Sequence, residues 1–283
     1  MFERSVTRHL GLLVVFAVLH PRSAPAQIQI LAEKEPQRVF SGDGRKVLLT
    51  IHNSGDTLFD VELRTRLYQA STAKAIPAGD FPWKRLQVPP GETVIDAAAL
   101  HFPPVKAETR YIVQWTEGTT RLVGMTEVFV YPPDLLKDLK PLASTNAVGV
   151  LDPQNQLKPL LKAVGVEVFD LERLDWAEFK GKLAVIGPFR AKAQMRGDLP
   201  TQIRSLAGRG TAVVWIQPPP EKRPELPPSY FTVQESRGTV VVAQASVVVN
   251  LPESPQAQLA LLQLARQALH PEPPKLPTSL YGL

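Results

Sequence analysis

The chain has 283 residues, of which 44% are hydrophobic and none is cysteine. That length and apolar content allow one large domain or two of ordinary size, each with its own core, so disorder throughout is excluded. The lack of cysteine excludes thiol nucleophiles, disulfides and thiolate metal sites. The formal charge of +5 falls to about +3 without the first 26 residues, which hold three Arg and one Glu. No dense basic run remains, so nucleic-acid binding is not expected.

The N-terminus has the pattern of a cleavable signal peptide over residues 1–26. Arg4 and Arg8 precede an apolar run over 10–19, and Ala24-Pro25-Ala26 supplies the small residues that a signal peptidase accepts. A membrane anchor is the alternative, but ten apolar residues rise only about 15 Å as a helix, half of a bilayer core. We expect cleavage before Gln27, no membrane span afterwards, and a periplasmic or secreted protein.

Residues 27–131 have the period-two pattern of a β domain. The clearest strand is 61–67, where apolar residues and threonine alternate with Glu62, Arg64 and Arg66. Turn residues separate the runs, and about seven strands in 105 residues are typical of an immunoglobulin-like β-sandwich. The other predicted strands are 28–31, 46–52, 93–97, 110–115 and 122–131.

A linker over 132–143 leads to a region, residues 144–270, in which strands and helices alternate. Such alternation predicts a parallel sheet with helices on both faces, here of the flavodoxin-like or amidotransferase-like kind. A Pro-rich tail follows over 271–283. The predicted strands are 147–151, 167–169, 183–186, 211–216, 239–243 and, as a further strand, 246–249; the predicted helices are 156–164, 174–179, 199–207 and 256–269.

Ligands of open α/β sheets bind beyond the carboxyl ends of the strands. The candidate ligand-binding residues there are Asp152, Asp170, Gly187 and Gln217, which follow the first four strands. Each also has a structural explanation: an aspartate before a helix can cap it, Gly-Pro forms a turn, and Gln217 ends a strand before a proline. No Gly-rich loop follows the first strand, so nucleotide binding is disfavoured and no cofactor is expected.

Catalytic residues and metal ligands are not predicted. The three histidines after residue 26 are scattered along the chain, and no Gly-x-Ser-x-Gly elbow occurs. Paired carboxylates could serve a glycosidase, but a solvated loop is the simpler interpretation of the one acidic cluster. The three histidines are His52, His101 and His270, and the acidic cluster consists of Asp170, Glu172 and Asp175.

Tryptophan is the residue most suited to a sugar platform. Of Trp83, Trp115, Trp176 and Trp215, only Trp83 falls in an evidently exposed loop, whereas Trp115 and Trp215 belong to apolar strand patterns that favour the core. Trp83 is therefore the fifth candidate ligand-binding residue.

The second half resembles the class I glutamine amidotransferase-like domains that occur as non-catalytic modules in bacterial β-galactosidase-type and other multidomain envelope proteins. The segments that carry this resemblance are Ala147-Val148-Gly149-Val150-Leu151-Asp152, Leu183-Ala184-Val185-Ile186-Gly187-Pro188 and Gly210-Thr211-Ala212-Val213-Val214-Trp215-Ile216-Gln217. The preceding region, with Leu49-x-Ile51-His52-Asn53-Ser54-Gly55, looks like the immunoglobulin-like sandwiches attached to such proteins. Active members of the family use a Cys nucleophile, which this chain lacks, so no catalytic residue is carried over.

The leading hypothesis is an exported, non-enzymatic binding or accessory protein of the cell envelope, whose partner is an envelope protein or a glycan. The alternative is a carbohydrate-binding or carbohydrate-active protein, and a third possibility is a scaffold that dimerises through its α/β domain. The sequence does not determine the oligomeric state.

Overall fold

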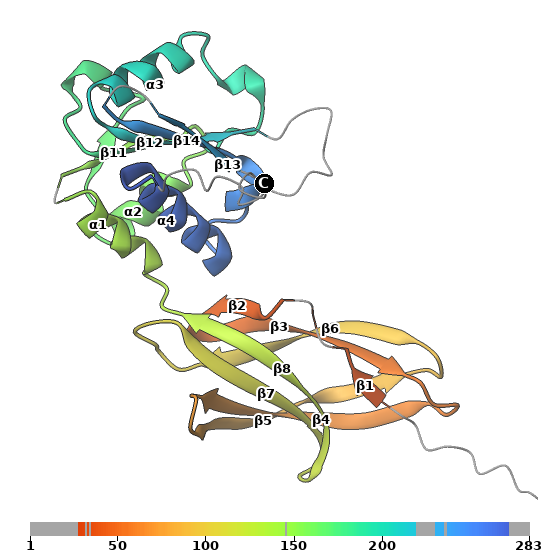
Figure 1. The fold of residues 1–283 in the computed structure, drawn as a ribbon. Helices are drawn as coiled ribbons and strands as arrows, with labels where there is room; N and C mark the ends of the chain where they lie inside the picture. Colours follow the sequence, from red (N-terminus) through yellow and green to blue (C-terminus); the bar gives the residue numbers. More distant parts are fainter. Residues whose placement is uncertain are drawn as a thin grey trace, which may run out of the picture.

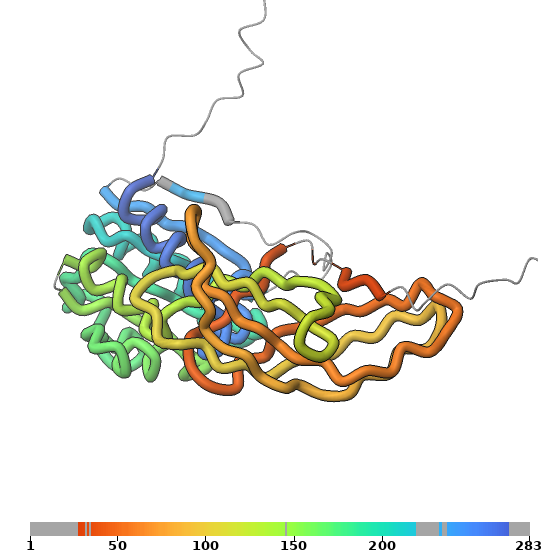
Figure 2. Tube along the Cα trace, turned by 90° about the horizontal axis from the view of Figure 1, so that it is seen from below, coloured from red at the N-terminus to blue at the C-terminus, as the bar shows by residue number. Residues whose placement is uncertain are grey.

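The computed structural model describes residues 28–271 except 32, 34, 145, 219–229, 235 and 236. The predicted signal peptide, and all of the predicted tail but Pro271, lie outside the described residues. The chain forms an N-terminal part made of strands and a C-terminal part in which strands and helices alternate (Figure 1). Viewed at right angles, the N-terminal part extends away from the C-terminal part (Figure 2).

Two sheets pack face to face in the N-terminal part. One has the strand order β1-β3-β6 and the other β2-β8-β7-β4-β5. Their inner faces share one core, to which Leu49 and Leu100 contribute from the first sheet and Leu63 and Trp115 from the second. The strands are β1 (Ile28–Ile30), β2 (Gln37–Phe40), β3 (Gly42–Asn53), β4 (Phe59–Ala70), β5 (Ala75–Val88), β6 (Thr93–Phe102), β7 (Thr109–Glu117) and β8 (Arg121–Tyr131).

Strand β5 was not predicted, because Pro77, Gly79 and Pro82 interrupt its pattern. It forms nevertheless, because it lies at the edge of its sheet and its ladder with β4 has two register shifts, one next to Pro82 and one next to Pro77. Edge positions and bulges are where a sheet tolerates proline.

A six-stranded sheet of order β10-β9-β11-β12-β14-β13 organises the C-terminal part. The first five strands in that order are parallel, and β13 is antiparallel to β14. The strands are β9 (Val148–Leu151), β10 (Val168–Asp170), β11 (Leu183–Ile186), β12 (Ala212–Gln217), β13 (Tyr230–Gln234) and β14 (Thr239–Gln244); the helices are η1 (Leu135–Asp138), α1 (Leu139–Leu142), α2 (Leu157–Ala163), η2 (Trp176–Glu178), η3 (Lys192–Gln194), α3 (Leu199–Gly208), η4 (Ala245–Val248) and α4 (Pro255–Leu269).

Helices cover both faces of this sheet, which explains why its central strands are continuously apolar. On one face Val214 packs in a core with residues of α2 and α4, and on the other face its neighbour Val213 packs with α3. The strand predicted over 246–249 is wrong, because residues 245–248 form the 3-10 helix η4. The segment forms a short helix between β14 and α4 instead of adding a strand to the sheet.

The predicted fold class is wrong. An immunoglobulin-like sandwich followed by a flavodoxin-like or amidotransferase-like parallel sheet does not describe the molecule, which is mixed α/β with three sheets that include parallel strands. In the N-terminal part β2 runs parallel to β8, and in the C-terminal part the antiparallel β13 makes the sheet mixed. Periodicity shows which side chains face a core, but strand direction depends on contacts between distant residues.

The two parts meet at a small apolar cluster. Phe40 at the end of β2 and Tyr131 at the end of β8 pack with Leu135, and Leu259 of α4 lies against them. The Tyr131 hydroxyl donates a hydrogen bond of 2.5 Å to the Glu108 carboxylate. Burial and this carboxylate raise the pKa of Tyr131 to about 12.

Candidate functional site

The carboxyl ends of β9, β10 and β11 form one edge of the C-terminal sheet, and the chain leaves them in different directions. After β9 it enters α2 on one face of the sheet, and after β11 it reaches α3 on the other. Loops that diverge in this way leave a crevice at the sheet edge, where ligands of α/β proteins usually bind.

Asp152 follows β9 and is 2% exposed. Its Oδ2 accepts hydrogen bonds from the backbone N–H groups of Leu157 and Lys158, at 2.7 and 2.9 Å, and so satisfies donors at the start of α2. Its own N–H donates to Glu172 Oε1 at 2.9 Å. Oδ1 is buried without a hydrogen-bond partner among the described residues. Asp152 thus holds the start of α2 in place.

Asp170 ends β10 and is bound to Lys158. The Lys158 ammonium, whose side chain is 11% exposed, donates to Asp170 Oδ1 and to Glu172 Oε2, both at 2.8 Å. Burial raises the pKa of Asp170, but hydrogen bonds from Lys158 and from the Glu172 N–H outweigh it and leave that pKa below its usual value. Lys158 is therefore a structural cation that favours the ionised form of Asp170 and also binds Glu172.

Gly187 joins the ends of three strands. Its φ is +102°, its N–H donates to Leu151 O at 2.8 Å, and a Cβ atom at this position would lie 2.4 Å from the carbonyl oxygen of Ile216. Only glycine fits such a position. The following peptide bond to Pro188 is cis, and Phe189 then turns into the core beneath the crevice.

The other two predicted site residues are Gln217 and Trp83. Gln217 ends β12 and pairs with Gln244 of β14, and it is not part of the crevice lining. Trp83 lies within strand β5 rather than in an exposed loop. Its half-buried ring is 5.1 Å from that of Trp115, so much of its face is used for packing. The structure therefore brings Asp152, Asp170, Gly187 and Gln217 to the carboxyl edge of one sheet and places Trp83 in the N-terminal part, and none of these five residues is among those that line the crevice.

The crevice has a volume of about 270 Å³ and adjoins a more open groove of about 480 Å³. Its lining combines six apolar residues with four polar or charged ones. The two cavities share Leu171, Glu172, Trp176, Arg196 and Gln202; the crevice adds Leu151, Pro153, Phe189, Gln194 and Leu199, and the groove adds Arg173, Leu174, Asp175, Ala177, Ser205 and Arg209.

Trp176 is the central side chain of the crevice and the groove. Its indole Nε1 donates to Leu171 O at 2.7 Å, and Arg209 donates to the Trp176 and Ala177 carbonyls at 2.6 and 3.0 Å. These bonds hold η2 against the end of α3 and fix the indole ring. A preorganised aromatic wall loses little conformational entropy when a ligand binds.

Two polar groups at the rim have hydrogen-bonding capacity to spare. The Arg196 residue is exposed, and its guanidinium makes no hydrogen bond or ion pair with the other described residues. Gln194 uses its Oε1 to accept from the Arg190 and Ala191 N–H groups, at 2.7 and 3.4 Å, which leaves its amide donors available. A few polar groups around an apolar pocket are typical of ligand sites.

Sequence reasoning missed most of this lining. Arg196 and Gln202 come from the η3–α3 region, which pattern alone does not place beside η2. Trp176 was considered for a sugar platform, and its position just after the end of a predicted strand is the signal that could have favoured it. No group of His, Asp and Glu side chains suited to a metal ion occurs within the described ranges.

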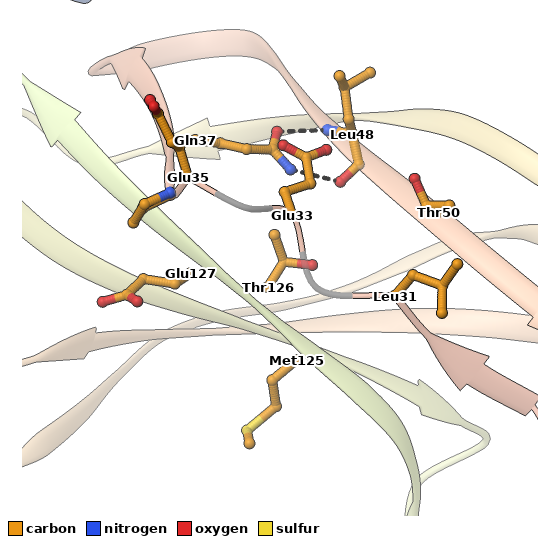
Figure 3. A pocket seen from close by; sticks show the side chains of 10 residues that line it. Leu31, Glu33, Glu35, Gln37, Leu48, Thr50, Met125, Thr126 and Glu127 are labelled. Atoms are coloured by element: carbon orange, nitrogen blue, oxygen red, sulfur yellow. Dashed lines mark hydrogen bonds between the residues drawn. The ribbon is translucent and has the colours of Figure 1, made fainter.

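A second cavity, of about 290 Å³, lies in the N-terminal part where the chain crosses from β1 in one sheet to β2 in the other (Figure 3). Leu31, Leu48 and Met125 line it together with three glutamates, Glu33, Glu35 and Glu127. Two of these glutamates pair with arginines, Glu35 with Arg38 and Glu127 with Arg110. It lacks a fixed aromatic wall, so the crevice at the sheet edge is the better candidate site.

Among the described residues, no helix is long and apolar enough to cross a membrane. No family model matches the chain, and no curated protein matches it. Solved structures match it weakly. A β-glucosidase from Listeria innocua in complex with glucose is 15% identical over 38% of this chain and 16% of that one, with a TM-score of 0.27, and the GH3 β-glucosidase of Bifidobacterium adolescentis is 13% identical over 38% of this chain and 17% of that one, with a TM-score of 0.26. The Pseudomonas fluorescens alkylpurine DNA glycosylase AlkC bound to DNA containing an abasic site analog is 13% identical over 38% of this chain and 31% of that one, with a TM-score of 0.29. The chain thus spans less than a third of the length of each of these proteins, and similarity at this level carries no argument about fold or function.

Proposed function

We propose that this chain is an exported, non-enzymatic binding or accessory protein of the cell envelope, and that it holds its ligand or partner in the crevice at the ends of β9, β10 and β11. Export rests on the signal-peptide pattern of residues 1–26.

The observation that carries the proposal is a fixed indole in the crevice wall beside carboxylates that are already paired with a cation. Trp176 is fixed and open to the crevice, which it lines together with apolar and polar side chains, whereas Asp170 and Glu172 are bound to Lys158. Asp170 is a poor proton donor, because its pKa is lowered. This arrangement favours binding over acid–base chemistry.

The crevice also indicates the chemistry of the ligand. An apolar or flat group would pack against Trp176 and Phe189, and a carboxylate or hydroxyl group would reach the guanidinium of Arg196 at the rim. An apolar or flat side chain of an envelope protein, with an acidic group next to it, has this chemistry. The open groove beyond Trp176 would accommodate the neighbouring residues of such a segment.

Carbohydrate binding is the second candidate function. Trp176 stands beside the amide side chains of Gln194 and Gln202, and a sugar ring combines an apolar face that stacks on an indole with hydroxyls that bond to amides. In this version the platform is Trp176 rather than Trp83, whose ring packs against Trp115.

The test is cross-linked capture by the tagged mature chain from the envelope of its own host cells, alongside a glycan-binding screen. Arg196→Ala and Trp176→Phe should each reduce binding at least several-fold, since they remove the rim charge and the fixed indole. Arg204→Ala is the matched control, because Arg204 is exposed on α3 but does not line the crevice. A protein lost selectively from the two crevice variants would support the accessory role, and a glycan lost in the same way would support the alternative. Binding that is equal in all three variants would rule out the crevice as the binding site.

A further inference from the structure

The amide of Gln194 is fixed so that it offers the crevice only hydrogen-bond donors. A free amide side chain can turn either its oxygen or its N–H groups toward a ligand. Gln194 Oε1 accepts from the Arg190 N–H at 2.7 Å and from the Ala191 N–H at 3.4 Å, and an NH₂ group in that place could not accept them. The N–H groups of Gln194 are therefore what this lining residue has left for a ligand.

The segment that carries Gln194 is held from the neighbouring loop. Gln154, after β9, donates through Nε2 to Pro188 O at 3.1 Å and accepts through Oε1 from Arg190 Nε at 2.9 Å. These bonds join the chain after β9 to the chain after β11. Because the backbone N–H of Arg190 also binds Gln194, the orientation of the Gln194 amide is set before a ligand arrives.

The charges at the crevice favour an anion. Three cations, Arg190, Lys192 and Arg196, fall within the exposed stretch 190–196, which contains no acidic residue. None of the three forms an ion pair within the described part of the chain. The acidic residue of the crevice lining, Glu172, already accepts hydrogen bonds through both oxygens, one of them from the Lys158 ammonium. The unpaired charge in the lining is thus the positive charge of Arg196.

Gln202 on α3 offers the crevice an acceptor instead. Its Nε2 donates to Asp198 Oδ2 at 2.7 Å, and because a carboxylate can only accept, Oε1 is the atom of this amide that is left for a ligand. The apolar part of the lining includes Trp176 and Phe189. A ligand that matches all of these groups has an acceptor for Gln194 and Arg196, a donor for Gln202 and an apolar part.

We propose that the crevice selects a carboxylate next to an apolar side chain, and that Gln194 is the residue that determines this specificity. The proposal rests on the proposed function, in which the crevice is the binding site. The carboxylate would accept hydrogen bonds from the Arg196 guanidinium and the Gln194 amide, while the side chain packs against Trp176. The C-terminal residue of a polypeptide combines such a carboxylate with a side chain and with an N–H that can donate to Gln202. A neutral sugar would leave the charge of Arg196 without a partner.

The test is calorimetric titration of the mature chain at neutral pH with N-acetyl-phenylalanine and, as the matched neutral probe, with its amide. The acid should bind with a dissociation constant lower than that of the amide by about tenfold or more, because hydrogen bonds to a charged acceptor are stronger. The NMR signal of the Trp176 indole N–H, identified by its loss in Trp176→Phe, should shift when either probe binds, which places the probe in the crevice.

Substitution of Gln194 shows whether the fixed amide sets the preference. Gln194→Glu keeps an oxygen for the Arg190 and Ala191 N–H groups but turns a charged oxygen toward the ligand. The acid should therefore lose about tenfold or more in affinity, and the amide less than about twofold. Gln156→Glu is the matched control, because it adds the same charge in the loop before α2 but does not line the crevice. Arg196→Gln should abolish the preference for the acid.

The outcomes separate this specificity from the binding site itself. If the acid and the amide bind the native chain equally, or if the preference for the acid survives Gln194→Glu, the specificity is overturned while the crevice remains a binding site. If neither probe moves the Trp176 signal, the assignment of the binding site to the crevice is overturned as well.

Discussion

Lys158 Nζ donates a hydrogen bond of 2.8 Å to Asp170 Oδ1, and this contact joins the start of α2 to the end of β10. Because Lys158 also binds Glu172, two carboxylates beside the crevice share this one buried cation. The position of the Glu172 segment, and with it one wall of the crevice, therefore depends on a lysine that does not itself line the crevice.

Replacing this lysine should destabilise the protein more than replacing its exposed neighbour on the same helix. Lys158→Met keeps the packing of the aliphatic stem but leaves Asp170 and Glu172 without their cation, so we expect a loss of about 1–3 kcal/mol in the free energy of unfolding. Lys162→Met, at an exposed position of α2, should change it by less than about 0.5 kcal/mol. Urea unfolding of the two variants makes the comparison, and equal effects would contradict the structural role of Lys158.

Acid should weaken the fold through Asp170. Its pKa is lowered in the folded chain, so its stabilising contribution is present above the unfolded pKa of about 3.9 and is lost as the pH falls through the folded value. The free energy of unfolding should therefore drop below about pH 4, and it should drop less steeply in Asp170→Asn. The measurement is chemical unfolding of both proteins at a series of acidic pH values. Parallel curves would show that Asp170 is not linked to the acid transition.

Gly187 should not accept a side chain. In Gly187→Ala the added Cβ would meet the Ile216 carbonyl oxygen, and the backbone would hold φ at +102°, so we expect a loss of about 2–3 kcal/mol or more. Gly197→Ala is the matched control, because its Cβ would meet no atom within 4 Å. Thermal unfolding of both variants distinguishes them, and a Gly187→Ala protein as stable as the control would contradict this geometry.

The Tyr131 hydroxyl should ionise at a higher pH than that of an ordinary tyrosine. Its pKa is raised to about 12, so the stabilisation from its hydroxyl is complete below the unfolded pKa of about 10 and is lost as the pH rises through the folded value. Spectrophotometric titration of the folded protein should show a component near pH 12 that is absent in Tyr131→Phe. If that component remains in the variant, the Tyr131–Glu108 bond is not its cause.

The sequence predicted the elements better than their assembly. The apolar run that contains Val213 and Val214 identifies a buried strand, and the helix predicted over 256–269 begins one residue earlier, at Pro255, where the Ser254 Oγ accepts from the Ala257 N–H. Turn and strand-end residues likewise pointed to Asp152, Asp170 and Gly187, because an open α/β sheet places such residues at one edge.

Only the tertiary structure decided strand direction, the crevice walls and the role of the acidic residues. The parallel pairing of β2 with β8 joins residues about ninety positions apart, and Arg196 and Gln202, which follow Trp176 by 20 and 26 positions, line the same crevice. Local pattern fixes which face of a strand or helix is apolar, because that depends on a period of a few residues. Which elements meet depends on the free energy of packing the whole chain. A side chain such as Lys158 therefore acquires its partners only when the whole chain has packed.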